Sequence, residues 1–252
     1  GIRRQRQMCI RDRHTSMEGL YFDSSITTPF HFISVSGLAK RPSNPVGGLS
    51  YINNQFDQGV EHLNHLGVDY FISYTEEIES KAMDSEKLIL LFSSEPFSVF
   101  KVNSSKVELI YQDIQIFSKA STQDGILSSI LRDTNINNFF DKAYESFDEL
   151  DKKRVIEVSN GMNIVSSKKN DLQITNLNIS NNKISFFTDS PRELHLIKVS
   201  YFPNWKITNG KGPFRTSPSF MSVIPDNKYV EITFENTVVE KNSFYFSIFS
   251  LL

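Results

Sequence analysis

Apolar and polar residues alternate strictly in short runs through the second half of the chain. Such alternation places one face of a strand in a core and the other face near water. Ile184 and Phe186 fall on one face of their run, with Ser185 and Phe187 on the other. The predicted strands are Arg154–Val158, Leu172–Ile179, Lys183–Thr188, Leu194–Tyr201, Trp205–Thr208, Phe220–Ile224 and Tyr229–Phe234. Seven short strands at this spacing predict an antiparallel β-sandwich, jelly-roll-like in outline.

The stretch Leu194–Phe234 concentrates this pattern. It holds the only tryptophan, three alternating runs, and several Pro and Gly residues between them. Glycine and proline are the strongest local signals for turns. We therefore expect the strands of this stretch to lie consecutively in one antiparallel sheet layer.

The first half mixes helical and strand patterns. Val60, Leu63 and Leu66 repeat at helical spacing between Asp57, a candidate N-cap, and Gly67, which suits a left-handed residue after a helix. The further predicted elements are a buried strand Val68–Ser73, a short helix capped by Thr75, and strands at Lys87–Phe92, Phe97–Val102 and Val107–Phe117. These elements predict a small mixed α/β part. The residues before it, His14–Ser50, are rich in Pro and Gly and are expected to be irregular, anchored by Phe30, Phe32 and Ile33.

Residues 123–153 have a helical period instead. An apolar stripe runs along the second predicted helix, opposite a strongly acidic face, and comprises Phe139, Phe140, Ala143, Tyr144, Phe147 and Leu150. A lipid- or partner-binding helix would show a similar stripe, but the acidic face would be repelled by anionic lipid. We interpret the stripe as part of the core. The expected fold is therefore α+β: an α/β part over residues 14–122, a helical linker over 123–153 and a β-sandwich over 154–240.

The N-terminal run Arg3–Arg13 (RRQRQMCIRDR) resembles a sequencing adapter translated in frame, so residues 1–13 are expected to lie outside the folded protein and to be disordered. A basic nucleic-acid arm or a targeting peptide is the alternative. Removing its five Arg and one Asp from the 27 basic and 29 acidic residues leaves 22 and 28, a net charge of −6. That balance argues against a nucleic-acid partner. The only cysteine, Cys9, lies in the same run, so neither a disulfide nor a thiolate site is expected.

Few residues suggest chemistry. We find no phosphate-binding glycine loop, nucleophile elbow or metal-spaced cluster, and expect no catalytic residue, no metal and no cofactor. His62 and His65 lie three apart on the predicted helix, but without a third ligand a solvated face is the simpler interpretation. The candidate ligand-binding residues are Tyr201, Phe202, Trp205 and Lys206 in YFPNWK, because aromatic faces can stack on sugar rings. Closure of the core is the alternative role for this Tyr and Trp.

Four segments carry a family resemblance. VSYFPNWKITNGKG resembles the (V/L)xxxYYPGWKAxVDGK signature of YfhO-type bacterial membrane proteins. In the same order as in that family, HLNHLGVDYFIS resembles LLGVKYVI, SEPFSVFKVNSSKVELIYQ resembles a VYENxxxLPRAF segment, and FMSVIPDNKYVEITFEN resembles closing strands written VxVPxGxHxVxFxY. Together they cover residues 55–236. Asn204 replaces the family glycine, and the Pro-Arg pair of the middle motif is missing.

The resemblance, which extends to polytopic proteins labelled as related to 6-pyruvoyl-tetrahydropterin synthase, implies a GT-C-like membrane parent similar to glycosyltransferases that use lipid-linked sugars. It implies an accessory domain on the extracytoplasmic face of the bacterial plasma membrane, contacting cell-envelope glycan or a lipid-linked sugar. The parent's catalytic acids would lie upstream, so none is assigned here. A free carbohydrate-binding module and a purely structural ectodomain are the alternatives. Residues 241–252, which include SFYFSIFSLL, are expected to begin a membrane helix, with a final core strand as the alternative.

Overall fold

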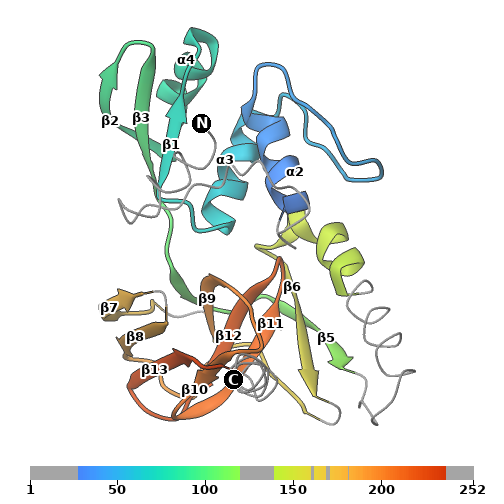
Figure 1. Cartoon of the computed structure of the whole chain (residues 1–252), viewed down its shortest axis with the longest axis vertical. Helices are drawn as coiled ribbons and strands as arrows, with labels where there is room; N and C mark the ends of the chain where they lie inside the picture. The colour runs from blue at the N-terminus through green and yellow to red at the C-terminus, as the bar shows by residue number, and fades with distance from the viewer. Residues whose placement is uncertain (1–27, 120–138, 160–161, 169–170, 181, 237–252) are drawn as a thin grey trace, which may run out of the picture.

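The computed structural model describes residues 28–119, 139–159, 162–168, 171–180 and 182–236. The chain has the expected α+β fold, with β-sandwich-like antiparallel sheets. Figure 1 shows an upper part that holds helices α2, α3 and α4 with strands β1, β2 and β3, and a lower part that holds strands β4 to β13.

The upper part places helices against one face of a three-stranded sheet. Its helices are α2 (Thr28–Leu38), α3 (Phe56–His65) and α4 (Glu76–Asp84), and its strands are β1 (Tyr70–Ser73), β2 (Leu88–Ser94) and β3 (Phe97–Val102). The sheet has the order β1-β3-β2 and is antiparallel throughout. Val60 and Leu63 of α3 share a core with Ala82 of α4 and with Phe100 and Val102 of β3. Gly67 has φ +69°, as expected for the residue that ends α3.

Three predictions for this part were wrong. Asp57 is not the N-cap of α3, because it lies in the first turn of the helix and Gln55 is the N-cap residue. Residues 28–38, expected to be irregular, form α2, because Pro29 lies in the first turn, where no backbone N–H is needed. Phe30 and Ile33 anchor this helix in the core, as predicted, whereas Phe32, the third predicted anchor, is only partly buried. Strand β1 is not buried on both sides: Tyr70 and Ile72 are exposed, and only the opposite face meets the helices. An apolar run alone does not distinguish a strand buried on two faces from one buried on a single face.

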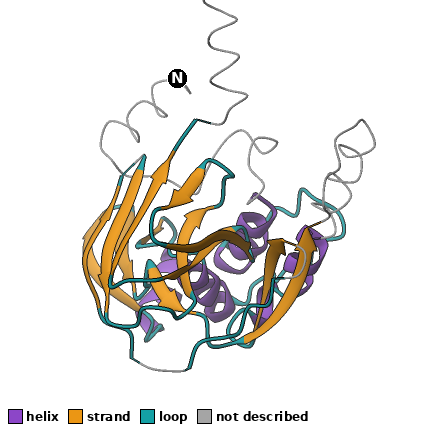
Figure 2. Cartoon of the chain, turned by 90° about the horizontal axis from the view of Figure 1, so that it is seen from below, coloured by secondary structure: helices purple, strands orange, loops and turns teal. Residues whose placement is uncertain are grey.

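The lower part is a sandwich of two sheets. The six-stranded sheet has the order β4-β9-β12-β11-β6-β5, and the four-stranded sheet has the order β10-β13-β8-β7. The strands are β4 (Val107–Leu109), β5 (Asp113–Lys119), β6 (Lys153–Ser159), β7 (Ile174–Ile179), β8 (Lys183–Thr188), β9 (His195–Ser200), β10 (Trp205–Ile207), β11 (Gly210–Thr216), β12 (Phe220–Pro225) and β13 (Tyr229–Phe234). Seen from below, these strands form a curved wall with helices beyond it (Figure 2).

One core joins the two sheets. Ile184, Phe186, Val230 and Ile232 from the four-stranded sheet pack with residues of β4, β9 and β12. Those partners are Val107, Ile197, Met221 and Val223. The burial of one face of β8 and β13 confirms the alternation read from the sequence.

The stretch 194–234 does not lie in one layer, contrary to our expectation. Strands β9, β11 and β12 belong to the six-stranded sheet, whereas β10 and β13 belong to the four-stranded sheet. Strand β11 was missed because its Gly and Pro residues resemble a turn. Gly210 and Gly212 both have positive φ, and the pairing with β12 is irregular between Lys211 and Phe214. Glycine allows such an irregular strand to continue.

The six-stranded sheet also recruits residues from before the predicted boundary at residue 122. Strand β4 pairs with β9, and β5 pairs in parallel with β6. Helical residues 139–145 and the short 3₁₀ helix η2 (Phe147–Glu149) lie in the connection between β5 and β6. Phe139, Phe147 and Leu150 are buried against Phe30 and Val155, so the apolar stripe belongs to the core as predicted.

A buried ionic network joins the two parts. Glu108 of β4 lies between two cations: its Oε1 is 3.1 Å from Arg154 Nη2, and its Oε2 is 2.9 Å from Lys198 Nζ. Both cationic side chains are only 1% exposed. Lys198 also donates a hydrogen bond to the Asn64 carbonyl at the end of α3 (2.9 Å), and Arg154 donates one to the Ser217 carbonyl (3.1 Å). The network therefore connects the upper helices to the six-stranded sheet.

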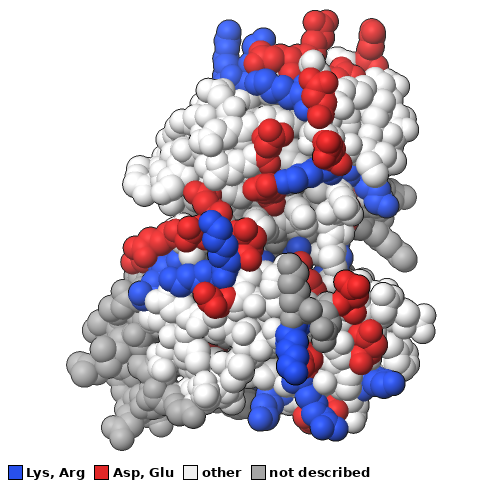
Figure 3. Space-filling model, turned by 180° about the vertical axis from the view of Figure 1, so that it is seen from behind, with Lys and Arg blue, Asp and Glu red and all other residues white. Residues whose placement is uncertain are grey.

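Acidic and basic side chains are intermingled on the back of the molecule, with wide uncharged areas between them (Figure 3). This distribution gives no sign of a basic surface for nucleic acid on that face. The first predicted helix of the linker, residues 1–13 and residues 241–252 lie outside the described residues. Within the described ranges, no helix is long and apolar enough to cross a membrane.

Candidate functional site

The outer face of the four-stranded sheet gathers side chains from three strands. Opposite residues in neighbouring strands share a face, so the register decides which side chains meet. Lys206 of β10 is opposite Thr233 of β13, and Tyr229 of β13 is opposite Phe187 of β8. All four point away from the sandwich core, because their sequence neighbours Trp205, Ile232, Val230 and Phe186 are buried in it.

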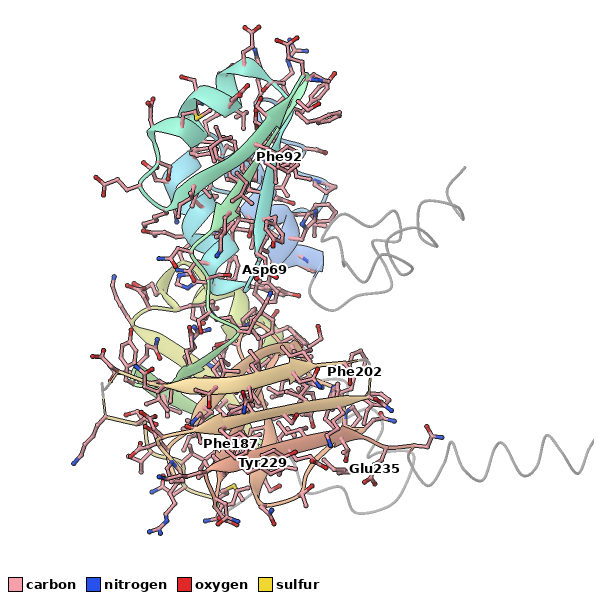
Figure 4. The ribbon with its side chains drawn as sticks, turned by 90° about the vertical axis from the view of Figure 1, so that its left-hand side faces the viewer. Asp69, Phe92, Phe187, Phe202, Tyr229 and Glu235 are labelled. Carbon is pink, nitrogen blue, oxygen red and sulfur yellow. The ribbon has the colours of Figure 1, made fainter. Side chains whose placement is uncertain are left out.

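Two exposed aromatic rings lie together on this face. The centroids of Phe187 and Tyr229 are 5.0 Å apart, with their planes inclined at 48°. Phe187 is 43% exposed and Tyr229 38%, although each has the size of a core side chain. Figure 4 looks onto this face and shows the two labelled residues side by side on the lower sheet. The pair therefore offers an aromatic surface to solvent.

A charged row follows directly beside the rings. Glu231 Oε2 accepts a hydrogen bond from the Tyr229 hydroxyl (2.6 Å) and lies 2.8 Å from Lys183 Nζ. The Lys183 ammonium, followed by the Tyr229 hydroxyl, lowers the pKa of Glu231. The same contacts raise the pKa of Lys183 and of Tyr229. At neutral pH the row consists of a carboxylate, an ammonium and a protonated phenol in fixed positions.

This arrangement is suited to binding rather than to bond breaking. An aromatic surface covers the apolar face of a ligand, and the adjoining charged and hydroxyl groups bind its polar edge. A sugar ring presents both kinds of surface. Glu231 is already engaged by Lys183 and Tyr229, which together hold its carboxylate at the edge of the aromatic rings. The face therefore has the form of a ligand-binding platform.

The structure disperses the four residues proposed from YFPNWK. Trp205 is buried in the sandwich core, with its ring edge-on to Phe234 at 5.1 Å. Lys206, the next residue, lies on the outer face opposite Thr233. Phe202 is 53% exposed in the turn before β10 and contacts the edge of Phe234 at 6.4 Å. Only Lys206 thus lies on the face that carries Phe187 and Tyr229.

Tyr201 has a packing role. Its ring is half-buried and lies 4.9 Å from the guanidinium carbon of Arg215, which also lies over the rings of Phe139 and Phe140 at 5.7 and 5.6 Å. Burial raises the pKa of the Tyr201 hydroxyl. These cation–π contacts attach the helical residues 139–145 to the six-stranded sheet.

Asn204 also contributes to structure. Its side-chain Nδ2 donates a hydrogen bond to the Glu235 carbonyl at 3.0 Å. This bond secures the chain after β13 to the turn before β10.

The sequence interpretation missed Phe187 and Tyr229 as site residues. The alternation of apolar and polar residues could have revealed them, because it places Phe187 and Tyr229 on the solvent-facing sides of their strands. A large aromatic side chain on the solvent-facing side of a predicted strand indicates a binding surface more often than one on the core-facing side does.

A Thr–His pair is the nearest approach to a catalytic arrangement. Thr188 Oγ1 lies 2.8 Å from His195 Nε2, and His195 Nδ1 lies 2.8 Å from the Glu193 carbonyl. Because Nδ1 must donate to that carbonyl, Nε2 accepts from the threonine hydroxyl. Thr188 is 3% exposed and His195 is 0% exposed, and burial lowers the pKa of His195. The pair links β8 to β9 across the sandwich, where no substrate reaches it.

The histidines of α3 also have structural positions. His62 was expected on a solvated face, but it is 1% exposed, with Nε2 2.9 Å from Asp148 Oδ1 and its ring 4.5 Å from Phe147. The sequence of α3 alone does not predict that His62 is buried, because Phe147 and Asp148, which cover it, follow much later in the chain. Within the described residues, no three His, Cys, Asp or Glu side chains are placed to hold a metal ion.

Neither a protein-family model, nor a curated protein, nor a solved structure matches the chain. We therefore infer the function from the residues themselves.

Proposed function

We propose that the chain is a non-catalytic accessory domain that contacts glycan through the outer face of its four-stranded sheet. The observation that supports this proposal is the exposed Phe187–Tyr229 pair beside the Lys183–Glu231 row. Neither ring is needed to fill the sandwich core, which β8 and β13 fill from their other face. Exposed aromatics held next to fixed polar groups are typical of a recognition surface.

The proposed setting is a GT-C-like membrane protein, with this domain on the extracytoplasmic side. The four motifs quoted above support the setting, and the face described here supplies the proposed contact with cell-envelope glycan or a lipid-linked sugar. Sequencing of the DNA on both sides of this reading frame tests the setting. Several apolar spans upstream of residue 14 would support it, and a complete upstream sequence without such spans would contradict it.

Glycan recognition is tested by an array of bacterial envelope glycans probed with the full chain and three variants. Phe187→Ala and Tyr229→Ala remove the platform one ring at a time. Phe202→Ala is the matched control, because it removes an exposed aromatic side chain outside the platform. We expect the two platform variants to lose binding and the control to keep it. Absence of binding by the wild type, or equal binding by all four proteins, would contradict the proposal.

A structural ectodomain is the second candidate. The burial of Trp205 and the packing of Tyr201 on Arg215 support it, because both residues of the family-like motif serve the fold. This candidate predicts that no glycan on the array is bound. It also predicts that removal of the domain destabilises the parent without altering its specificity.

A further inference from the structure

Among the described residues, no element covers one apolar face of the three-stranded sheet in the upper part. Helices α3 and α4 cover the other face through the core that contains Phe100 and Ala82. On the face opposite these helices, Lys101 of β3 lies between Tyr70 of β1 and Ile89 of β2. In the same way, Val99 of β3 lies between Ile72 of β1 and Phe92 of β2. Tyr74 and Phe97 extend the surface at one end, with their rings 5.7 Å apart. We call this surface the open face; its large members are Tyr70, Ile72, Tyr74, Ile89, Phe92 and Phe97.

The open face is large for a surface that stays in water. Its six large members are between 49% and 66% exposed. At about 200 Å² for a whole side chain of this kind, they present roughly 650 Å² of mostly apolar surface. The largest apolar patch on a typical monomer is about 300–600 Å². A standard protein–protein interface buries about 800 Å² on each partner, so the six large side chains of this face alone supply most of the area that a stable complex needs.

A lipid bilayer fits this face less well than a protein does. Strands β1 and β2 each have a hydrogen-bonded neighbour on one side only among the described strands. Their other backbone groups would lose water without gaining a partner if the sheet entered hydrocarbon. The nearby helix α4 begins with Glu76, Glu77 and Glu79, and the β2–β3 turn carries Glu95. These acids would also be repelled by anionic lipid.

The charges at the two ends of the open face favour a second copy of the chain. Lys101 lies at one end of β3, and the exposed Glu95 lies in the turn at its other end. A two-fold axis that lies between the two open faces and runs across the middle of β3 reverses one copy relative to the other. Lys101 of each copy then lies at the end where the partner carries Phe97 and the turn with Glu95. Unlike charges meet and like charges are kept apart, as a self-complementary interface requires.

We propose that the chain forms a homodimer in which the open faces of two copies pack face to face. The dimer buries Ile72 and Phe92 near the axis and leaves the outer face of the four-stranded sheet available. In Figure 4, Phe92 lies in the upper part of the molecule and Phe187 and Tyr229 lie in the lower part, so the reversed copies would place their two candidate glycan-binding faces at opposite ends of the dimer. The proposal does not depend on glycan binding.

Sedimentation velocity of the full chain over a range of micromolar concentrations tests the dimer. Phe92→Arg places a charge near the axis and is expected to give a monomer. Phe187→Arg is the matched control, because it changes an exposed phenylalanine on a different face and is expected to leave the dimer intact. Circular dichroism of both variants verifies that they are folded. A wild type that remains monomeric, or a Phe92→Arg protein that remains dimeric, would overturn the proposal.

A charge swap tests the orientation of the two copies independently of apolar packing. Lys101→Glu and Glu95→Lys, each alone, are expected to weaken the dimer about tenfold by bringing like charges together. The double variant is expected to recover most of the wild-type affinity. Failure of the double variant to recover it would overturn the two-fold arrangement. Flotation of a monomeric wild type with phosphatidylcholine vesicles would instead identify the open face as a lipid-binding surface and would overturn the dimer.

Discussion

Replacing Glu108 with Gln is expected to destabilise the sandwich strongly. The substitution keeps the shape of the side chain and removes the only carboxylate in contact with both Arg154 and Lys198 among the described residues. Both cations remain buried, and burial is the main cause that lowers the pKa of each of them. Breaking a buried ion pair by removing one partner costs about 3–5 kcal/mol. Because Glu108 is itself 29% exposed and thus reached by water, we expect about 3 kcal/mol, the lower end of that range.

Urea unfolding followed by the fluorescence of Trp205 measures this loss. Trp205 is the only tryptophan and lies in the sandwich core, so its emission reports on the part that contains the network. Glu231→Gln is the matched control. It also removes a carboxylate bound by two side chains, but Lys183 and Tyr229 are exposed, so its unfolding curve is expected to superimpose on that of the wild type.

The pH dependence distinguishes charge from shape in this experiment. In Glu108→Gln, the pKa of Lys198 in the folded chain falls further below its value in the unfolded chain. A lowered lysine pKa means that the folded state disfavours the proton, so the deficit of the variant is expected to shrink as the pH rises above neutral. A deficit below about 1 kcal/mol, the size found for surface pairs, would refute the conclusion that this network supports the fold.

Three further substitutions or conditions probe the junction and the sandwich. Thr188→Val leaves His195 Nε2 buried without its donor and is expected to cost about 1–3 kcal/mol in urea unfolding; no loss would show that the bond is unimportant. Burial, with the nearby Arg154 and Lys198, lowers the pKa of His65 to about 4. The folded chain therefore disfavours its proton, and up to about 3 kcal/mol of stability should disappear as the pH falls from about 6.5 towards 4, a loss that His65→Gln should reduce. Gly67→Ala forces alanine to φ +69° and places its Cβ 3.0 Å from the Lys198 side chain. We therefore expect a loss of about 1–2 kcal/mol in urea unfolding. An unchanged unfolding midpoint would contradict this strain.

Local pattern predicted much of the secondary structure. Strands β8 and β13 have the predicted bounds, because alternation is a property of neighbouring residues and survives in any antiparallel pairing. The apolar stripe on residues 139–150 was interpreted correctly for the same reason: its helical period needs no knowledge of what it packs against.

The arrangement of strands in sheets could not be predicted in this way. Strands β9 and β10 follow one another across a short turn, yet they belong to different sheets. Pairing partners depend on contacts between distant residues, and no local pattern in YFPNWK distinguishes a turn within a sheet from a turn between sheets. Strand β11 was not predicted, because Gly210, Gly212 and Pro213 are typical of a turn and hide the strand pattern. Its pairing with β12 nevertheless forms a strand there.

The candidate site shows the same limit. Lys206 was proposed from the sequence, but its neighbours on the outer face come from β8 and β13. The meeting of Phe187 with Tyr229 depends on register, which is set by the whole sandwich. Trp205 was proposed because it is the only tryptophan. Since neighbouring residues of a strand point to opposite faces, Lys206 lies on the outer face and Trp205 lies in the core.

Nuclear magnetic resonance of the full chain, titrated with a glycan bound on the array, identifies the residues that the glycan contacts. The aromatic signals of Phe187 and Tyr229 report on the platform, and those of Phe202 and Phe92 report on exposed aromatics elsewhere. The account predicts that saturating glycan shifts the signals of Phe187, Tyr229 and the adjoining residues of β8 and β13. Shifts confined to Phe202 or Phe92, or no shift in any signal, would contradict the assignment of the outer face as a glycan-binding surface.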